Sequence, residues 1–335
     1  DAAGAELVPS GGPVIFAPAD AESLLSFRGV RYRGAVRVLA EPGGLAVVNH
    51  VELEQYLRGV VPREMPSRWG NDAPEALEAQ AIAARSYAYI RVPSDAAVEP
   101  RSGWHMVATV QNQVYAGLDV EAPIVNEAID RTAGLVIRYN GLLVDAPYFS
   151  SCGGRTAAPK ESWRDVREEP YLPSVDDTDP RTGRPYCDIA PRNHWTEEFD
   201  EAQLSEAVRR ALVAAGARDP RPGVMTAMRV EGRTTSGRAT ALVLRTDRGD
   251  VTVRNNEIRN VLRNTRGAIL SSTYFSIERE SRVRGHLSGV TLRGHGNGHG
   301  VGMCQWGAIG RSRAGLDART ILRHYYPGTV VGFAD

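Results

Sequence analysis

Apolar residues recur at helical spacing in several stretches of the chain. A helix over 75–88 would carry Leu77 and Ala81 on one face. Asp72 is placed to cap this helix, and Pro74 fits its first turn. We expect further helices at 52–59, 122–132, 201–215, 256–262, 303–313 and 318–325, the last of them capped by Asp317.

Other stretches alternate apolar and polar residues with the period of a β-strand. Asn140-Gly141 is the strongest short hairpin signal, and the turn residues of 41–44 predict a second hairpin. We expect strands at 30–39, 45–49, 109–115, 135–139, 142–146, 224–230, 239–246, 251–253 and 274–277. Because helices and strands alternate without a regular βαβ rhythm, the pattern predicts an α+β fold in which mixed helices and antiparallel strands form a substrate groove.

The chain shows a loosely patterned beginning and one long patterned region. Residues 1–28 are rich in Ala, Gly, Pro and Ser, so we expect a lead-in segment. Residues 29–335 are then expected to form one domain, with an inserted region at about 155–265 that contains its own helix and strands. We find no internal repeat and no low-complexity tract.

Charge and composition exclude some classes of partner. Lys plus Arg and Asp plus Glu both number 40, so no net field favours nucleic acid or an anionic membrane. No apolar run approaches the length of a membrane span. The opening Asp-Ala-Ala-Gly-Ala is typical of a chain from which a secretory leader or a tag has been removed. We therefore expect an extracytoplasmic protein, which would touch a membrane only through a removed or missing N-terminal segment.

The glutamate at position 64 lies between two prolines that restrict the backbone. Glu64 follows Pro62 by two residues and precedes Pro66 by two. Each proline fixes its own φ and biases the preceding residue, Val61 or Met65, towards extended geometry. This predicts a short rigid connector that presents the carboxyl group, although a lone glutamate is more often an ordinary surface residue.

Two long motifs around this position and near the C-terminus carry a resemblance. Residues 53–66, ending Leu-Arg-Gly-Val-Val-Pro-Arg-Glu-Met-Pro, are followed by Glu-Ala-Leu-Glu-Ala-Gln-Ala-Ile-Ala-Ala-Arg-Ser-Tyr-Ala at 75–88. Residues 294–308 read Gly-His-Gly-Asn-Gly-His-Gly-Val-Gly-Met-Cys-Gln-Trp-Gly-Ala. In both blocks the chain resembles the SpoIID/LytB family, which contains stage II sporulation protein D and the amidase-enhancer proteins.

The resemblance implies lytic cleavage of peptidoglycan glycan strands, best known on strands stripped of their peptides. Glu64 matches the catalytic acid of the family. It would protonate the leaving oxygen, and the C6 hydroxyl of the substrate would attack the anomeric carbon, leaving a 1,6-anhydromuramic end. Burial beside Met65, Trp69 and Tyr87 is expected to raise the pKa of Glu64. No cofactor is required.

The same comparison supplies substrate-binding residues. Arg85, His299 and Gln305 match recurring polar positions, to which we assign substrate positioning. The Ser-rich double-glycine segment, residues 148–156, resembles a segment of the family and would offer main-chain amides to a ligand. Alternate glycines in 294–302 would let backbone lie flat against a polymer. The predicted binding set is Arg85, Ser151, Gly153, Gly154, His295, His299, Gln305 and Trp306.

The odd count of three cysteines leaves alternatives open. Cys152 and Cys187 lie in neighbouring loop-rich segments, so a disulfide between them, with Cys304 as a free thiol, is the preferred arrangement. A metal site that uses both sulfurs and His194 is the alternative, because some family members bind zinc near the Cys-Gly-Gly turn. Arg155 and Tyr148 depart from that zinc-binding pattern. Cys304 stands where the family often has serine, and a nucleophilic role for it is not favoured.

Two other functions compete with glycan cleavage. A non-catalytic protein that binds cell-wall glycan and enhances an amidase would need the same groove but not the acid. A secreted zinc hydrolase would need stoichiometric metal. The expected partners are therefore peptidoglycan strands and a cell-wall amidase, with no nucleic acid.

Overall fold

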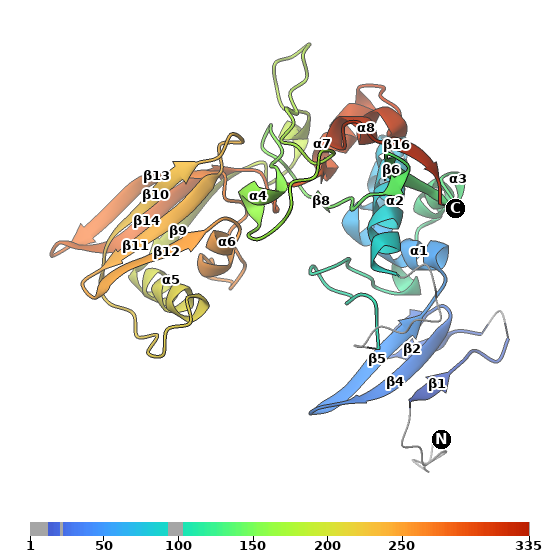
Figure 1. Cartoon of the computed structure of the whole chain (residues 1–335), viewed down its shortest axis with the longest axis horizontal. Coiled ribbons are helices and arrows are strands. Elements are labelled where there is room, and N and C mark those ends of the chain that lie inside the picture. Colours follow the sequence, from blue (N-terminus) through green and yellow to red (C-terminus); the bar gives the residue numbers. More distant parts are fainter. Residues whose placement is uncertain (1–12, 21–22, 93–102, 335) are drawn as a thin grey trace. The chain divides into compact units, whose positions relative to one another are not determined.

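The computed structural model describes residues 13–20, 23–92 and 103–334 and divides into two compact units. Unit 1 contains the chain up to Asp145 and also the C-terminal residues from Val331 onward. Unit 2 contains the chain from Ala146 to Val330 (Figure 1). The single domain over 29–335 with an inserted region at about 155–265 stays a prediction. None of the helices in the described ranges combines the length and the hydropathy that a membrane span requires.

Unit 1 begins with short antiparallel strands. Strands β1 (Val14–Phe16), β4 (Ala35–Glu41) and β5 (Gly44–His50) form one sheet in the order β1-β4-β5, and β2 (Leu25–Phe27) pairs with β3 (Val30–Tyr32). The predicted hairpin at 41–44 is confirmed, since Glu41 pairs with Gly44 across the turn. Part of the predicted lead-in segment is therefore strand, and residues 1–12 of it lie outside the described residues.

Helices form the core of unit 1. These are α1 (Leu53–Glu64), α2 (Pro74–Arg91) and α3 (Pro123–Arg131), with 3₁₀ turns η1 (Ser67–Trp69) and η2 (Leu118–Val120). Helix α2 starts at Pro74 as predicted, but its N-cap is Ala73 and no side chain caps it, so the predicted cap at Asp72 is wrong. Strands β6 (Leu135–Tyr139), β7 (Leu142–Leu143) and β16 (Val330–Phe333) form a sheet in the order β16-β6-β7. The predicted Asn140-Gly141 hairpin is confirmed, with φ of 50° and 81° at its two turn residues.

The strand predicted at 109–115 is wrong. This segment is irregular because its polar groups bond to helices rather than to a neighbouring strand. The Gln113 amide donates to the Ala84 carbonyl at 3.1 Å, and the Val114 N–H donates to a side chain at the end of α1. The segment therefore packs across the helices as a loop.

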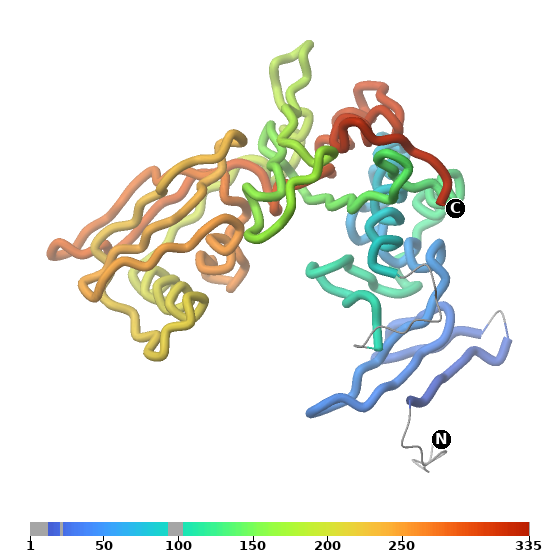
Figure 2. The backbone as a smooth tube through the Cα atoms, in the orientation of Figure 1, coloured from blue at the N-terminus to red at the C-terminus, as the bar shows by residue number. Residues whose placement is uncertain are grey.

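Most of unit 2 is a sheet-and-helix assembly whose chain path can be followed in Figure 2. Strands β10 (Met225–Arg233), β11 (Ala239–Thr246) and β12 (Gly249–Arg254) form one antiparallel sheet, and β13 (Phe275–Val283), β14 (His286–His295) and β9 (His194–Asp200) form another. Helix α5 (Glu201–Ala214) buries Leu204 and Val208 against both, and α6 (Glu257–Val261) closes the same core. Asp200 caps α5 with a capping box, which fixes where the helix starts.

The remainder of unit 2 carries the double-glycine turn and the C-terminal helices. Strand β8 (Tyr148–Phe149) pairs in parallel with β15 (Met303–Cys304), and α4 (Pro159–Ser162) and η3 (Tyr186–Ile189) follow β8 along the chain. Helices α7 (Gln305–Arg313) and α8 (Ala318–Tyr325) complete the unit. Asp317 caps α8 as predicted, accepting from the Thr320 N–H at 2.7 Å. The mixed helices and small sheets confirm the predicted α+β class.

Candidate functional site

Glu64 is the last residue of α1, not part of a connector. Pro62 lies inside the helix, so the predicted rigid loop around Glu64 and the extended geometry of Val61 are wrong. Burial explains the difference: Val60 and Val61 are fully buried, and their packing outweighs the helix-breaking effect of the proline. Met65 is extended, with φ of −132° and ψ of 107°, as the following proline predicts.

The Glu64 carboxyl group is half-buried between α1 and the 109–115 loop. Its Oε1 accepts a hydrogen bond of 3.2 Å from the Val114 N–H. Tyr56, on the same helix, donates to the Gln113 Oε1 at 3.0 Å. Burial, reinforced by the charge of Glu64, raises the pKa of Tyr56 above its ordinary value, so this phenol stays protonated. The loop therefore fixes the carboxyl group beside a neutral hydroxyl-bearing ring.

Arg85 lies inside the helical core of unit 1. Its side chain is 0% exposed and forms a bidentate pair with Glu54, with distances of 2.7 and 2.8 Å. It also donates to the Leu135 carbonyl at 3.0 Å and to the Ile129 carbonyl at 3.4 Å. These contacts favour a role in packing α2 against α1 and β6, and the predicted contact of Arg85 with substrate stays a prediction.

The double-glycine segment forms a tight turn held from both sides. Ser151 is buried and donates to the Asn193 Oδ1 at 2.7 Å. Gly153 has φ of 74°, and a Cβ there would lie 2.9 Å from the His295 Cβ. The Gly154 N–H donates to the Cys152 sulfur at 3.3 Å, so this amide is occupied within the protein.

The glycines of 294–302 are likewise required by packing within unit 2. A Cβ at Gly296 would lie 2.6 Å from the Ser151 carbonyl oxygen, and one at Gly302 would lie 2.0 Å from the Pro147 carbonyl oxygen. Both glycines have positive φ, 72° and 79°. The side of the backbone that we expected to lie against a polymer is therefore filled by the protein itself.

His295 belongs to a hydrogen-bonded chain with Asp188 and His194. The Asp188 Oδ1 lies 2.8 Å from the His194 Nε2, and the His194 Nδ1 lies 3.0 Å from the His295 Nδ1. The carboxylate selects the tautomer of His194 that donates from Nε2, so His295 donates from Nδ1 and its Nε2 remains an acceptor. Burial, with His194 and Arg293 nearby, lowers the pKa of His295, so the neutral ring dominates near neutral pH.

His299 has both ring nitrogens occupied by backbone. Its Nε2 donates to the Tyr148 carbonyl at 3.0 Å, and its Nδ1 accepts from the Val301 N–H at 3.1 Å. Burial, with Arg259 nearby, lowers the pKa of His299 to about 3. These bonds favour a structural role, and its predicted role in substrate positioning stays a prediction.

Gln305 and Trp306 open helix α7. Gln305 is 8% exposed. The backbone N–H of Trp306 donates to the Ser150 carbonyl at 3.0 Å, and this bond connects the helix to the double-glycine turn. The structure therefore brings Ser151, Gly153, His295 and Trp306 to one region of unit 2, whereas Glu64 and Arg85 lie in unit 1.

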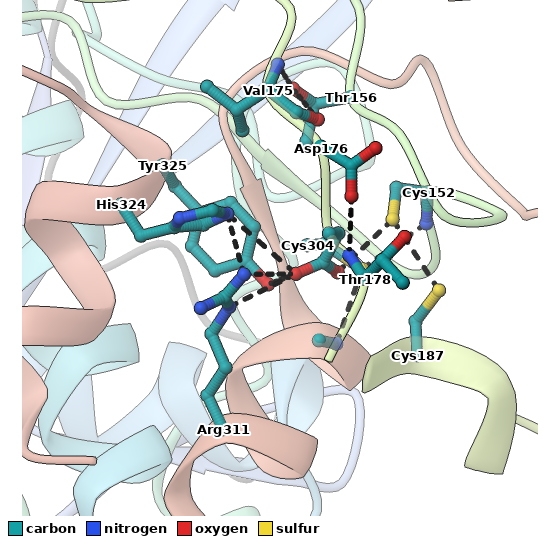
Figure 3. A network of polar contacts seen from close by, with 12 residues as sticks. Cys152, Thr156, Val175, Asp176, Thr178, Cys187, Cys304, Arg311, His324 and Tyr325 are labelled. Carbon is teal, nitrogen blue, oxygen red and sulfur yellow. Dashed lines mark hydrogen bonds and ion pairs between the residues drawn. The ribbon is translucent and has the colours of Figure 1, made fainter. Parts of the chain in front are cut away.

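All three cysteines meet at one buried point of unit 2 (Figure 3). The sulfurs of Cys152 and Cys187 are 3.4 Å apart, and no disulfide is formed in the structure. The predicted proximity of Cys152 and Cys187 is therefore confirmed, and the disulfide between them stays a prediction. Cys304 was expected to be a separate thiol, but its sulfur accepts from the Cys152 N–H at 3.2 Å. The ring of His194 is bonded to Asp188 and His295 instead.

The carboxyl group of Asp177 lies in the same buried cluster as the three cysteine sulfurs. Its Oδ2 accepts from the Cys152 thiol at 3.2 Å, whereas its Oδ1 accepts from Arg311 at 3.0 Å and from the Tyr325 hydroxyl at 2.8 Å. Burial raises the pKa of Asp177 to about 6 against the opposing effect of Arg311. Asp177 carried no signal in the sequence, since it is one of several acids in a charged stretch.

Two segments of the chain match family models. Residues 41–139 match the model described as stage II sporulation protein, SpoIID, and lie in unit 1. Residues 189–302 match a domain of unknown function and lie in unit 2.

Relatives align with most of the chain. An uncharacterised protein of Brachyspira hyodysenteriae is 31% identical, covering 90% of this chain and 73% of the relative. The amidase enhancer of Bacillus subtilis is 30% identical, and the alignment spans 82% of this chain but only 40% of that relative. Stage II sporulation protein D of Bacillus subtilis is 29% identical, with 90% of this chain and 83% of the relative covered.

Proposed function

Because this chain belongs to the SpoIID family, we propose that it is a lytic transglycosylase that cleaves the glycan strands of peptidoglycan, with peptide-stripped strands as substrate. Glu64 would act as the single acid and base. We further propose that the protein works outside the cytoplasm, where this polymer is found. The family membership supports the link to the cell wall, and the geometry around Glu64 supports the chemistry.

The observation that carries this proposal is the position of the Glu64 carboxyl group. It stands at the C-terminal end of α1, where the partial negative charge of the helix disfavours an ionised carboxylate. A half-buried site has the same effect. The Val114 N–H bond to Oε1 fixes the group in one orientation. A carboxyl group that is oriented and kept partly out of water is suited to donate a proton to a leaving oxygen.

The proposed reaction needs one carboxyl group. The Glu64 proton passes to the glycosidic oxygen as its bond to the anomeric carbon breaks. The C6 hydroxyl oxygen of the same sugar then bonds to that carbon and loses its proton to the Glu64 carboxylate. The acid is thereby regenerated, and no water is consumed. Hydrolases instead pair two carboxylates about 5–10 Å apart.

Unit 2 would contribute glycan contacts. His295 keeps an acceptor nitrogen at the end of a hydrogen-bonded chain, which suits a sugar hydroxyl. Trp306 is only partly buried, and an indole face packs well against the apolar face of a sugar ring. We propose these two residues as binding residues. The binding roles of Ser151, Gly153, Gly154 and Gln305 stay predictions.

A second candidate function is enhancement of a cell-wall amidase without catalysis. The observation that favours it is the 30% identity to a protein named amidase enhancer. In that case a cell-wall amidase would be the partner, and the glycan would be bound but not cut.

One experiment separates the two functions. The full chain is incubated with peptide-free glycan strands, and the products are examined by mass spectrometry for 1,6-anhydromuramic ends. Lytic cleavage predicts such ends without any added amidase. Intact strands, together with a faster amidase reaction on whole peptidoglycan when the chain is added, would favour enhancement instead.

A further inference from the structure

The three cysteines and Asp177 form a set of metal-ligating atoms from four separate segments of unit 2. One ligating atom from each residue lies within 4.8 Å of all the others, and all four residues are buried. In a tetrahedral zinc site with Zn–S bonds of about 2.3 Å, neighbouring sulfurs are about 3.8 Å apart. The Cys152 sulfur lies 3.4 Å from the Cys187 sulfur and 3.2 Å from the Asp177 Oδ2, so the ligands stand close to that arrangement.

Backbone amides point at the sulfurs. The Cys152 N–H and the Gly307 N–H both donate to the Cys304 sulfur, each at 3.2 Å. The Gly154 N–H donates to the Cys152 sulfur at 3.3 Å. A neutral thiol is a weak acceptor, whereas a thiolate gains from each such bond. These amides therefore favour anionic sulfur, which is the form that binds metal.

The carboxylate is oriented by a second set of partners. Arg311 and Tyr325 bind the Asp177 Oδ1, which leaves the Oδ2 directed towards Cys152. Outer partners of this kind fix ligating carboxylates in metal sites. Tyr325 is 1% exposed, so the outer contacts are also closed to solvent.

The positive charge of a buried arginine beside the cysteines favours a bound metal ion over a disulfide in this cluster. Arg238 is 1% exposed, donates to the Cys152 carbonyl at 3.0 Å, and forms no ion pair in the described part of the chain. With a disulfide, Asp177 balances Arg311 and leaves Arg238 uncompensated. Three thiolates, one carboxylate, one divalent cation and the two guanidinium groups sum to zero charge, so the metal-loaded state avoids an unpaired buried charge.

We propose that Cys152, Cys187, Cys304 and Asp177 bind one Zn²⁺ in a closed structural site. Thiolate ligands and tetrahedral geometry select zinc among the common divalent metals. Binding would release the thiol protons to solvent. Because all four positions are filled by protein atoms, no position remains for a reacting water. The metal would hold the double-glycine turn, η3 and the start of α7 together, and this role is independent of whether the chain cuts glycan.

The direct test is metal content and thiol count of the untagged full chain. After purification with zinc present and exhaustive dialysis, elemental analysis should find one zinc per chain. Denaturation with a chelator should then release three titratable thiols. Replacing zinc by Co²⁺ should give the thiolate-to-cobalt absorption of a tetrahedral site. Zinc-free protein, whether it shows one titratable thiol or three, overturns the proposal.

Variants distinguish a bound zinc ion from a disulfide in this cluster. Cys304→Ser and Asp177→Asn should lose stoichiometric zinc, whereas the neighbouring Asp176→Asn, an exposed acid paired with Arg155, should retain it. With a disulfide between the other two cysteines, Cys304→Ser would keep the native stability and show no titratable thiol after denaturation, and that result contradicts the metal site. Arg311→Lys, which weakens the outer contact, should lower zinc affinity by about 10- to 100-fold. Unchanged affinity would argue against the assigned ligand Asp177.

Discussion

Buried arginines constrain single residues in both units. A guanidinium group cannot lose its charge in a protein, so each buried arginine needs enough acceptors around it. Arg85 finds them in Glu54 and two carbonyl groups, and Arg311 finds Asp177. These residues should therefore matter to folding whether or not they touch a ligand.

The Glu54–Arg85 pair should stabilise unit 1 strongly. Glu54→Ala leaves a guanidinium group that is 0% exposed without its anion, so we expect the free energy of unfolding to fall by about 3 kcal/mol. The matched control is Glu78→Ala. Its partner Arg131 is 50% exposed, so the loss should stay below about 1 kcal/mol. Denaturant titrations measure both, and equal losses would contradict the structural role of Arg85.

His299 should make stability depend on pH. Its folded pKa, about 3, lies below the ordinary value, so the unfolded chain binds a proton more readily. Stability is therefore lost as pH falls from about 6.5 towards 3. Between pH 7 and 5 the native chain should lose about 1–2 kcal/mol that a His299→Asn variant does not lose. Parallel pH profiles for the two chains, measured by denaturant unfolding, would contradict the buried neutral ring.

Helix ends were predictable where a local hydrogen bond fixes them. Asp317 and Asp200 cap α8 and α5, and both helices begin where the sequence indicates. The end of α1 was not predictable, because Pro62 signals a break while buried Val60 and Val61 keep the helix intact. That balance depends on tertiary contacts, which the local sequence does not contain.

Close packing also explains a glycine within α1. A Cβ at Gly59 would lie 2.4 Å from the Tyr115 Cε2 and 2.9 Å from the Gly117 carbonyl oxygen. Alanine is intrinsically better in a helix by about 1 kcal/mol, but this overlap should outweigh the gain. We expect Gly59→Ala to lower the free energy of unfolding by about 1–3 kcal/mol. The exposed Gln55→Ala on the same helix should change it by less than about 0.5 kcal/mol. A more stable Gly59→Ala chain would contradict the packing seen here.

For the whole molecule, the sequence motifs identified the family and predicted Glu64 as the acid, but they did not predict the arrangement of the site. The glycine block indicated a bare surface, yet its glycines are needed for contacts inside unit 2. The cysteine count favoured one bridge and one free thiol, whereas Asp177 and Cys304 complete a four-residue cluster. Such convergence of distant segments arises from tertiary packing, so spacing along the chain could not show it.

The two units separate the proposed roles. Unit 1 holds Glu64, and unit 2 holds the proposed glycan contacts and the proposed zinc site. Loss of zinc should therefore weaken unit 2 without altering the chemical identity of the acid in unit 1. Glu64→Gln should slow cleavage while leaving zinc content and glycan binding unchanged.

The most direct test of the central claim is the yield of 1,6-anhydromuramic ends from peptide-free glycan, compared between the native chain and Glu64→Gln. Removal of the proton donor should lower the rate by about 10²- to 10⁴-fold. Glu52→Gln, an exposed change before the other end of α1, should leave the rate unchanged. Cleavage by Glu64→Gln at the native rate would contradict the assignment of Glu64 as the catalytic acid.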